Sequence, residues 1–217
     1  LVKGDAQAAS HTLTKEQQAA LSALQQGEGH SVVVLHGVTG SGKSEVFLRY
    51  ADQQVQQGKQ VLFLVPEIAL TPQMQRAVEA RFGDGAAIYH SHLSDQQKYE
   101  QYQLVAQGKV QVVVGTRSAI FLPFARLGAI ILDEEHDTSY KQENAPRYHC
   151  RDIAIWRGRH HGCKVILASA TPSLESYARA YKGVYQLIEM KSRIHQDLPP
   201  VEIVDMGAAL RRGENAL

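Results

Sequence analysis

Short apolar runs alternate along this chain with longer polar stretches that carry helix-type spacing. The runs are rich in β-branched residues, and several are apolar at every position, as strands buried on both faces are. They cover Val32–Leu35, Val61–Val65, Ala87–Tyr89, Val110–Val114, Ala129–Leu132, Val165–Ala168 and Val184–Ile188. Strands that alternate with helices predict an α/β fold, with a parallel sheet covered by helices on both faces.

Capping residues mark the expected helix starts. Thr14 and Ser94 are each followed three residues later by a glutamine, which is the spacing of a capping box. Thr71-Pro72 places proline at a first helical position, and Ser173 is expected to open a further helix. These signals predict helices that begin between the strands of the sheet.

The alternating pattern predicts one domain over residues 12–190. Residues 1–11 are small and polar without periodicity, and we interpret them as a flexible leader. Residues 191–217 carry Pro199-Pro200 and then a strand-like Val201–Val204, so we interpret them as a linker and the start of a truncated second lobe.

The amino-acid composition excludes few classes of protein and does not assign a function. The formal net charge is +1, from 23 Lys and Arg against 22 Asp and Glu, so any argument for nucleic-acid binding must rest on motifs. No apolar run approaches the roughly 18 residues of a membrane span, and no signal-peptide pattern is present, which predicts a cytoplasmic protein without a membrane partner. The two cysteines, Cys150 and Cys163, have no zinc-type spacing and are expected to be free thiols.

A phosphate-binding loop is predicted at Gly37–Ser44, which fits the pattern GxxxxGK[ST] between a strand and a helix. Glycines let successive backbone N–H groups face phosphates, Lys43 supplies a cation, and the Ser44 hydroxyl is a candidate Mg²⁺ ligand. The alternative, a glycine-rich turn with a chance lysine, is disfavoured by the complete match in that context. The expected nucleotide contacts are Gly37, Thr39, Gly40, Ser41, Gly42, Lys43 and Ser44.

Carboxylates follow directly after the apolar run Ala129–Leu132, in the sequence Asp133-Glu134-Glu135-His136. Ligands of parallel sheets lie beyond the carboxyl ends of the strands, so these acids are expected beside the phosphate loop. We predict that Asp133 holds Mg²⁺ with Ser44, and that Glu134 is the base that orients the attacking water. An acidic cluster without a phosphate loop would more often be a solvated turn.

The Asp-Glu-Glu-His sequence resembles motif II of superfamily 2 helicases, and Ser169-Ala170-Thr171 resembles their motif III. The resemblance implies a RecA-like lobe that uses ATP and Mg²⁺. It also implies that His136, Ser169 and Thr171 couple the nucleotide site to the nucleic-acid side. From the residues alone, His136 would be a histidine at a strand end, and the small residues would equally suit tight packing.

Gln17 has two competing predictions. In the helicases that the chain resembles, a glutamine upstream of the phosphate loop reads adenine, and we rank that role first. Gln17 also completes the capping box of Thr14, and one side chain does not readily perform both functions.

Two further segments resemble the DNA-contacting motifs Ia and Ib: Val65–Gln73 and Gly115–Ala119. On the resemblance, Thr71, Thr116 and Arg117 contact phosphodiester oxygens, which holds a strand without reading its sequence. Without it, Thr71 is a helix start and Arg117 an ordinary surface charge.

A polar segment, residues 137–152, separates the acidic box from the next apolar periodicity. Aromatic rings beside cations hold single-stranded nucleic acid by stacking and by phosphate contacts. The alternative is a solvated connection whose tyrosines pack back on the domain. Our candidates for DNA contact are Tyr140, Lys141, Arg147 and Tyr148.

This segment narrows the resemblance to the bacterial primosomal replication-restart DNA helicases, whose first helicase lobe the chain resembles over nearly all of residues 12–190. The resemblance implies DNA, primosome proteins and single-stranded DNA-binding protein as partners. It implies no zinc in this chain, only in another part of the protein, and a second lobe that supplies catalytic arginines, so that the chain alone hardly hydrolyses ATP. Two alternatives remain: a phosphate-loop ATPase or kinase that never touches DNA, and a module that only binds DNA or a primosome protein.

Overall fold

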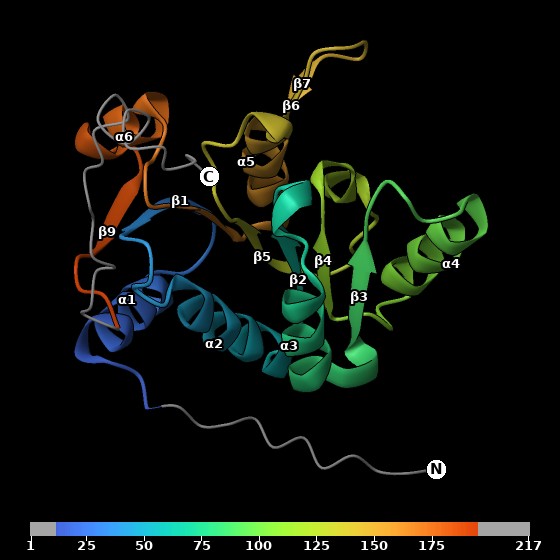
Figure 1. Ribbon diagram of the computed structural model, residues 1–217, viewed down its shortest axis with the longest axis horizontal. Coiled ribbons are helices and arrows are strands. Elements are labelled where there is room, and N and C mark those ends of the chain that lie inside the picture. The colour runs from blue at the N-terminus through green and yellow to red at the C-terminus, as the bar shows by residue number, and fades with distance from the viewer. Residues whose placement is uncertain (1–11, 195–217) are drawn as a thin grey trace, which may run out of the picture.

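The centre of the molecule is a parallel sheet of seven strands in the order β3-β4-β2-β5-β8-β1-β9 (Figure 1). A computed structural model describes residues 12–194; the predicted leader 1–11 and the strand-like Val201–Val204 lie outside the described residues. The strands are β1 (Ser31–Gly37), β2 (Gln60–Leu64), β3 (Ala86–Tyr89), β4 (Val112–Gly115), β5 (Leu127–Leu132), β8 (Lys164–Ser169) and β9 (Gln186–Met190). The predicted α/β fold of the RecA-like type is confirmed.

Each of the seven apolar runs forms a strand, with differences only at the ends. β4 begins at Val112 and β9 at Gln186, so Val110 and Val184 precede the strands that we predicted to include them. Val110 is buried without belonging to the ladder, and Val184 is exposed. Apolar residues thus extend beyond the residues that pair, and of these two valines only Val110 is buried.

Within residues 12–194, six helices cover the sheet. They are α1 (Lys15–Gln25), α2 (Lys43–Gln56), α3 (Pro72–Phe82), α4 (Asp95–Ala106), α5 (Cys150–His161) and α6 (Leu174–Tyr181). Short 3-10 turns lie at η1 (Glu67–Ala69), η2 (Gly83–Gly85), η3 (Arg117–Phe121) and η4 (Thr138–Tyr140). The predicted capping residues Thr14, Thr71, Ser94 and Ser173 all accept a backbone N–H in the first turn of their helices.

The core has two halves, one on each face of the sheet. Side chains of α1, α2 and α3 pack on one face, and side chains of α4, α5 and α6 pack on the other. Successive strand residues alternate between the two halves, as Val33 and Val34 do in β1. The central strands β2 and β8 are buried on both sides, and their inner positions are accordingly apolar, while polar residues stand only at their ends, at Gln60, Lys164 and Ser169.

An antiparallel hairpin, β6 (Lys141–Gln142) and β7 (Tyr148–His149), stands away from the sheet next to α5 (Figure 1). The sequence indicated only a polar connection here, because strands of two residues are too short to show a period.

Cys150 and Cys163 are free and buried, and burial raises the pKa of their thiols to about 12 and about 11 respectively. Across residues 12–194, no helix combines the length and apolar character that a membrane span requires.

Candidate active site

The phosphate loop leaves the carboxyl end of β1 and enters α2 at Lys43. Gly40 and Gly42 have φ of +80° and +78°, the left-handed region that glycine adopts without strain. A Cβ on Gly42 would lie 2.2 Å from Nε2 of Gln17 and 2.5 Å from Cδ1 of Ile194. The curled loop therefore requires glycine at this position for conformation and for space.

Two buried polar groups in the loop are incompletely satisfied within residues 12–194: Lys43 has no ion-pair partner, and the Ser41 hydroxyl has no hydrogen-bond partner. Lys43 is 9% exposed, donates from Nζ to the Gly37 carbonyl at 2.7 Å, and has no carboxylate within ion-pair distance in residues 12–194. The Ser41 hydroxyl is buried without a hydrogen-bond partner in the same range. Buried polar groups of this kind are costly unless a ligand satisfies them, and an anion at the start of α2 would do so.

The acidic box begins where β5 ends. Asp133 donates its N–H to the Leu64 carbonyl at 2.9 Å, and its carboxylate accepts the Glu134 N–H at 3.1 Å. Burial raises the pKa of the Asp133 carboxyl above its ordinary value, the Glu134 charge adds to this, and the Glu134 N–H and the Lys43 charge oppose it. Lys43 and Asp133, remote in sequence, are therefore electrostatic neighbours.

Ser44 and Asp133 line one pocket of about 360 Å³, together with Thr71 at the start of α3. The rest of the lining is apolar, so Ser44, Thr71 and Asp133 are its polar residues, and a hydroxyl and a carboxylate are oxygen ligands of the type that Mg²⁺ takes. With Lys43 and the glycine-shaped loop beside them, the residues present fit a magnesium–nucleotide complex.

His136 connects the acidic box to the segment after β8. Its Nδ1 lies 2.7 Å from the Ser169 Oγ, and the same hydroxyl accepts the Thr171 N–H at 2.9 Å. The Nδ1 is also 3.6 Å from the Glu134 carboxylate. The three predicted coupling residues are thus brought together, adjacent to the predicted base.

Gln17 takes the capping role that we ranked second. Its Oε1 accepts the Thr14 N–H at 2.8 Å, its Nε2 donates to the Gly42 carbonyl at 3.3 Å, and the residue is 3% exposed. Both ends of the amide are thus engaged and buried, and Gln17 ties α1 to the phosphate loop. The role of Gln17 in reading adenine stays a prediction.

Tyr140 cannot be a stacking platform, contrary to our prediction. It is fully buried, and its hydroxyl donates toward the carbonyls of Leu64 at 2.9 Å and Asp133 at 2.7 Å. Burial also holds the pKa of this hydroxyl well above its ordinary value, so it remains protonated and donates. Tyr140 anchors the segment after the acidic box to the ends of β2 and β5.

Tyr148 is half-buried and packs against the body of the domain. Its ring lies edge-on to Phe121 at 5.2 Å, and the Arg117 guanidinium lies 5.9 Å from its centre. Arg117 also donates to the carbonyls of Ser139 at 3.1 Å and Lys141 at 2.7 Å. Both tyrosines therefore follow the alternative of packing back on the domain, and Arg117 supports the hairpin instead of standing free.

The remaining predicted DNA contacts differ in exposure. Thr116 is 3% exposed, so its side chain has little surface to offer a strand. Thr71 is exposed but caps α3 by accepting the Met74 N–H. Lys141 and Arg147 are exposed on the hairpin, where Lys141 pairs with Glu143 at 3.2 Å.

We expect Tyr140→Phe to lower the free energy of unfolding by about 1–2 kcal/mol, because the Asp133 carbonyl loses a buried donor. Urea denaturation followed by circular dichroism would measure the change. The matched control is Tyr99→Phe on α4, which is 64% exposed and should differ from the parent by less than about 0.5 kcal/mol. Equal effects of the two substitutions would contradict the anchoring role.

Glu135 is the site residue to which we assigned no role. It is 1% exposed and accepts hydrogen bonds from Ser173 and Ser176 at the start of α6. The sequence held only an indirect signal, a second glutamate in the box and a predicted cap at Ser173. Nothing in it joined the two, because 38 residues separate Glu135 from Ser173.

A family model described as DEAD/DEAH box helicase matches residues 14–180, which include the phosphate loop, the acidic box and the Ser-Ala-Thr segment. The chain belongs to this family. DEAD/DEAH box helicases use nucleotide and Mg²⁺, which agrees with the pocket between Ser44 and Asp133.

Within this DEAD/DEAH box group, the chain is 50% identical over 209 residues to the replication restart protein PriA of Bacillus subtilis. It is 46% identical over 211 residues to the protein of the same name from Synechocystis. Each match covers 94% of this chain but 26% and 25% of the relative, so the chain spans about a quarter of the length of these two relatives.

Solved structures show the same helicase fold. RecG bound to a three-way DNA junction matches with a TM-score of 0.68 at 24% identity, over 94% of this chain and 27% of RecG. The helicase MrfA bound to DNA matches with a TM-score of 0.59 at 16% identity, over 83% of this chain and 27% of MrfA. At these identities the likeness concerns the fold alone.

Proposed function

We propose that this chain is the ATP-binding lobe of an ATP-dependent DNA helicase that acts in replication restart and primosome assembly at stalled forks. The observation that carries the proposal is the pocket that Ser44 and Asp133 share, beside the buried Lys43. The likeness to the replication restart proteins supports the biological role.

The nucleotide phosphates would be held by the backbone of residues 37–42 and by Lys43, and Mg²⁺ by Ser44 and Asp133. When bound, Mg²⁺ would neutralise charge on the phosphates. Glu134 would orient the attacking water and accept its proton. The carboxylate is suited to this because it is 39% exposed, next to the pocket instead of within the core.

On the nucleic-acid side, we assign phosphate contacts to Lys141 and Arg147 of the hairpin, with Arg117 holding the hairpin in place. The hairpin projects from the domain (Figure 1), and its exposed cations are accessible to a strand, which supports this assignment. His136, Ser169 and Thr171 would couple this side to the nucleotide. Forked and single-stranded DNA, primosome proteins and single-stranded DNA-binding protein are the partners that we propose.

The isolated 217-residue chain is expected to bind nucleotide but to hydrolyse it slowly. We infer that a second lobe of the full-length helicase supplies the arginines that stabilise the transferring phosphate, a contribution worth about 10³ to 10⁵ in rate. Isothermal titration with a non-hydrolysable ATP analogue, with and without Mg²⁺, would test binding, and a phosphate-release assay would test turnover. Absence of Mg²⁺-dependent binding would overturn the nucleotide function, and robust DNA-stimulated turnover would contradict the need for a second lobe.

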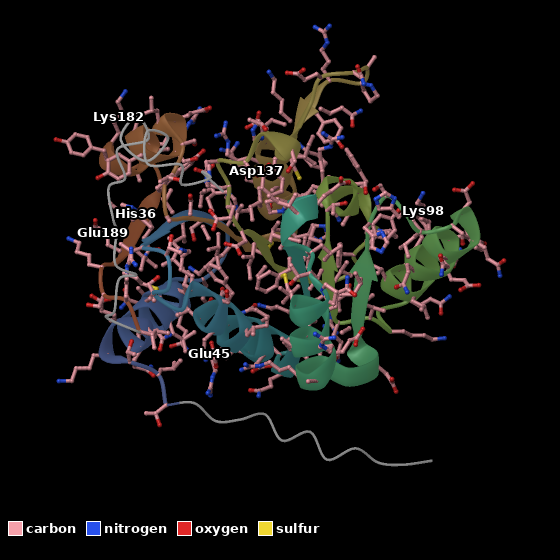
Figure 2. All side chains as sticks on the ribbon, in the orientation of Figure 1. His36, Glu45, Lys98, Asp137, Lys182 and Glu189 are labelled. Carbon is pink, nitrogen blue, oxygen red and sulfur yellow. The ribbon has the colours of Figure 1, made fainter. Side chains whose placement is uncertain are left out.

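We expect the double variant Lys141→Ala with Arg147→Ala to weaken binding of single-stranded DNA, because two phosphate contacts are lost. The slope of log affinity against log salt concentration should become shallower by about 1.4, at about 0.7 for each contact. Fluorescence anisotropy of a labelled oligonucleotide at several salt concentrations measures this. Lys98→Ala, on α4 away from the hairpin, is the control (Figure 2); the same slope in both variants would argue against a role of the hairpin.

A further inference from the structure

Glu135 links the acidic box directly to helix α6. Its carboxylate accepts the Ser173 N–H at 2.6 Å, the Ser173 hydroxyl at 3.3 Å and the Ser176 hydroxyl at 3.2 Å. Its own N–H donates to the Ala168 carbonyl at 2.9 Å. The buried side chain of Glu135, the next residue after the predicted base Glu134, therefore holds the start of α6.

The same helix also touches the strand that leads into the phosphate loop. The Tyr177 ring on α6 lies edge-on to the His36 ring, with centroids 6.2 Å apart, and His36 is the residue immediately before Gly37. Nε2 of His36 is 3.2 Å from the Ala170 carbonyl, within the Ser-Ala-Thr segment. Figure 2 shows His36 at the end of the sheet near α6.

The outer side of α6 is open. Leu174 is 90% exposed and Tyr181 86% exposed, although α6 rests on β1 and β9 (Figure 1). Its inward partners are therefore β1, which leads into the phosphate loop, and β9, together with Arg151 of α5, which pairs with Glu175 at 2.5 Å. Little packing within residues 12–194 restrains the helix from the other side.

We propose that Glu135 is a positioning residue that transmits the nucleotide state of the site to α6. The inference rests on the proposed nucleotide function. Glu134 has φ of +46°, a conformation that L side chains rarely adopt, so a backbone adjustment there moves the predicted base and Glu135 together. Three hydrogen bonds to one carboxylate then carry that adjustment to the first turn of α6.

The proposal is tested by hydrogen–deuterium exchange of the 217-residue chain, with and without a saturating non-hydrolysable ATP analogue and Mg²⁺. In the parent chain, amides of α6 should exchange more slowly with nucleotide than without. In Glu135→Ala this difference should be lost, while the amides of residues 37–44 remain protected by the nucleotide. A residue with a merely structural role would raise exchange in both states and leave the difference intact.

Glu175→Ala is the matched control, because it removes a carboxylate from the same turn of α6 without touching the acidic box. It should raise exchange of α6 in both states and preserve the nucleotide-dependent difference. If Glu135→Ala does not fold, Ser176→Ala replaces it in the test, because it deletes one of the three hydrogen bonds. The nucleotide-dependent difference in α6 exchange should then shrink.

Retention of the full difference in Glu135→Ala, or in Ser176→Ala if that variant has to decide, would overturn the proposal. The proposal would also be overturned if, in the parent chain, nucleotide protected the amides of residues 37–44 but left the exchange of α6 unchanged. In that case the nucleotide function would stand. Unprotected amides in residues 37–44 of the parent chain would instead remove the nucleotide function, and this inference with it.

Discussion

Lys43→Ala is expected to weaken binding of the magnesium–nucleotide complex by roughly 10- to 100-fold or more. The ammonium is the buried cation at the start of α2, and a charge-assisted hydrogen bond to an anion is worth about 1.5–3 kcal/mol, where 1.4 kcal/mol is tenfold in affinity. Isothermal titration of the 217-residue chain with a non-hydrolysable ATP analogue measures the loss directly.

A second substitution at Lys43 separates the loss of affinity caused by the missing charge from the loss caused by missing side-chain packing. Lys43→Met retains most of the aliphatic stem and should lose affinity nearly as strongly as Lys43→Ala, because only the ammonium faces phosphate. Lys98→Ala, which removes a partly exposed lysine of α4 that pairs with Asp95, should leave affinity unchanged. Normal affinity in Lys43→Met would show that the ammonium does not contact the nucleotide, and the assignment of the phosphate loop would be wrong.

On the proposed function, Glu134→Gln in the full-length protein is expected to reduce DNA-stimulated ATP hydrolysis by roughly 10²- to 10⁴-fold, the range for loss of a general base. The amide is isosteric with the carboxylate but cannot accept the proton of the attacking water. Nucleotide affinity should change little, because the phosphate contacts that we propose lie on Lys43 and the loop backbone. Steady-state phosphate release at saturating single-stranded DNA, with nucleotide binding measured in parallel, distinguishes the two effects.

Glu143→Gln provides the comparison, since it also replaces a glutamate by an amide, but on the exposed hairpin. Its turnover should remain near that of the parent protein. If Glu134→Gln retained full turnover, the base would have to be another group near the pocket, and Asp133 would be the first candidate.

Local sequence sufficed for the parts of the site that depend on consecutive residues. Glycines at 40 and 42 with Lys43 specify the phosphate loop, because φ of +80° and +78° and the backbone approach are properties of those residues themselves. Apolar runs with no polar position specify strands buried on both faces, and a parallel sheet brings their carboxyl ends to one edge. The meeting of Asp133 with the phosphate loop follows from these two facts.

Burial of polar side chains could not be predicted in the same way. Tyr140 and Tyr148 occupy equally polar sequence surroundings, yet one is fully buried against the Leu64 and Asp133 carbonyls and the other packs at the surface. Gln17 satisfied two patterns, and the structure shows that it completes the cap and contacts the Gly42 carbonyl. In each case the deciding partner comes from another part of the chain.

The sequence by itself determined the α/β sheet, the phosphate loop, the acidic box and the helicase family, because each is encoded in a short contiguous pattern. Only the tertiary structure decided which polar residues share a pocket with Asp133, which support the hairpin and which link the acidic box to α6. Glu135 and Ser176 meet across 41 residues of sequence, and a buried carboxylate must find its donors wherever the folded backbone places them.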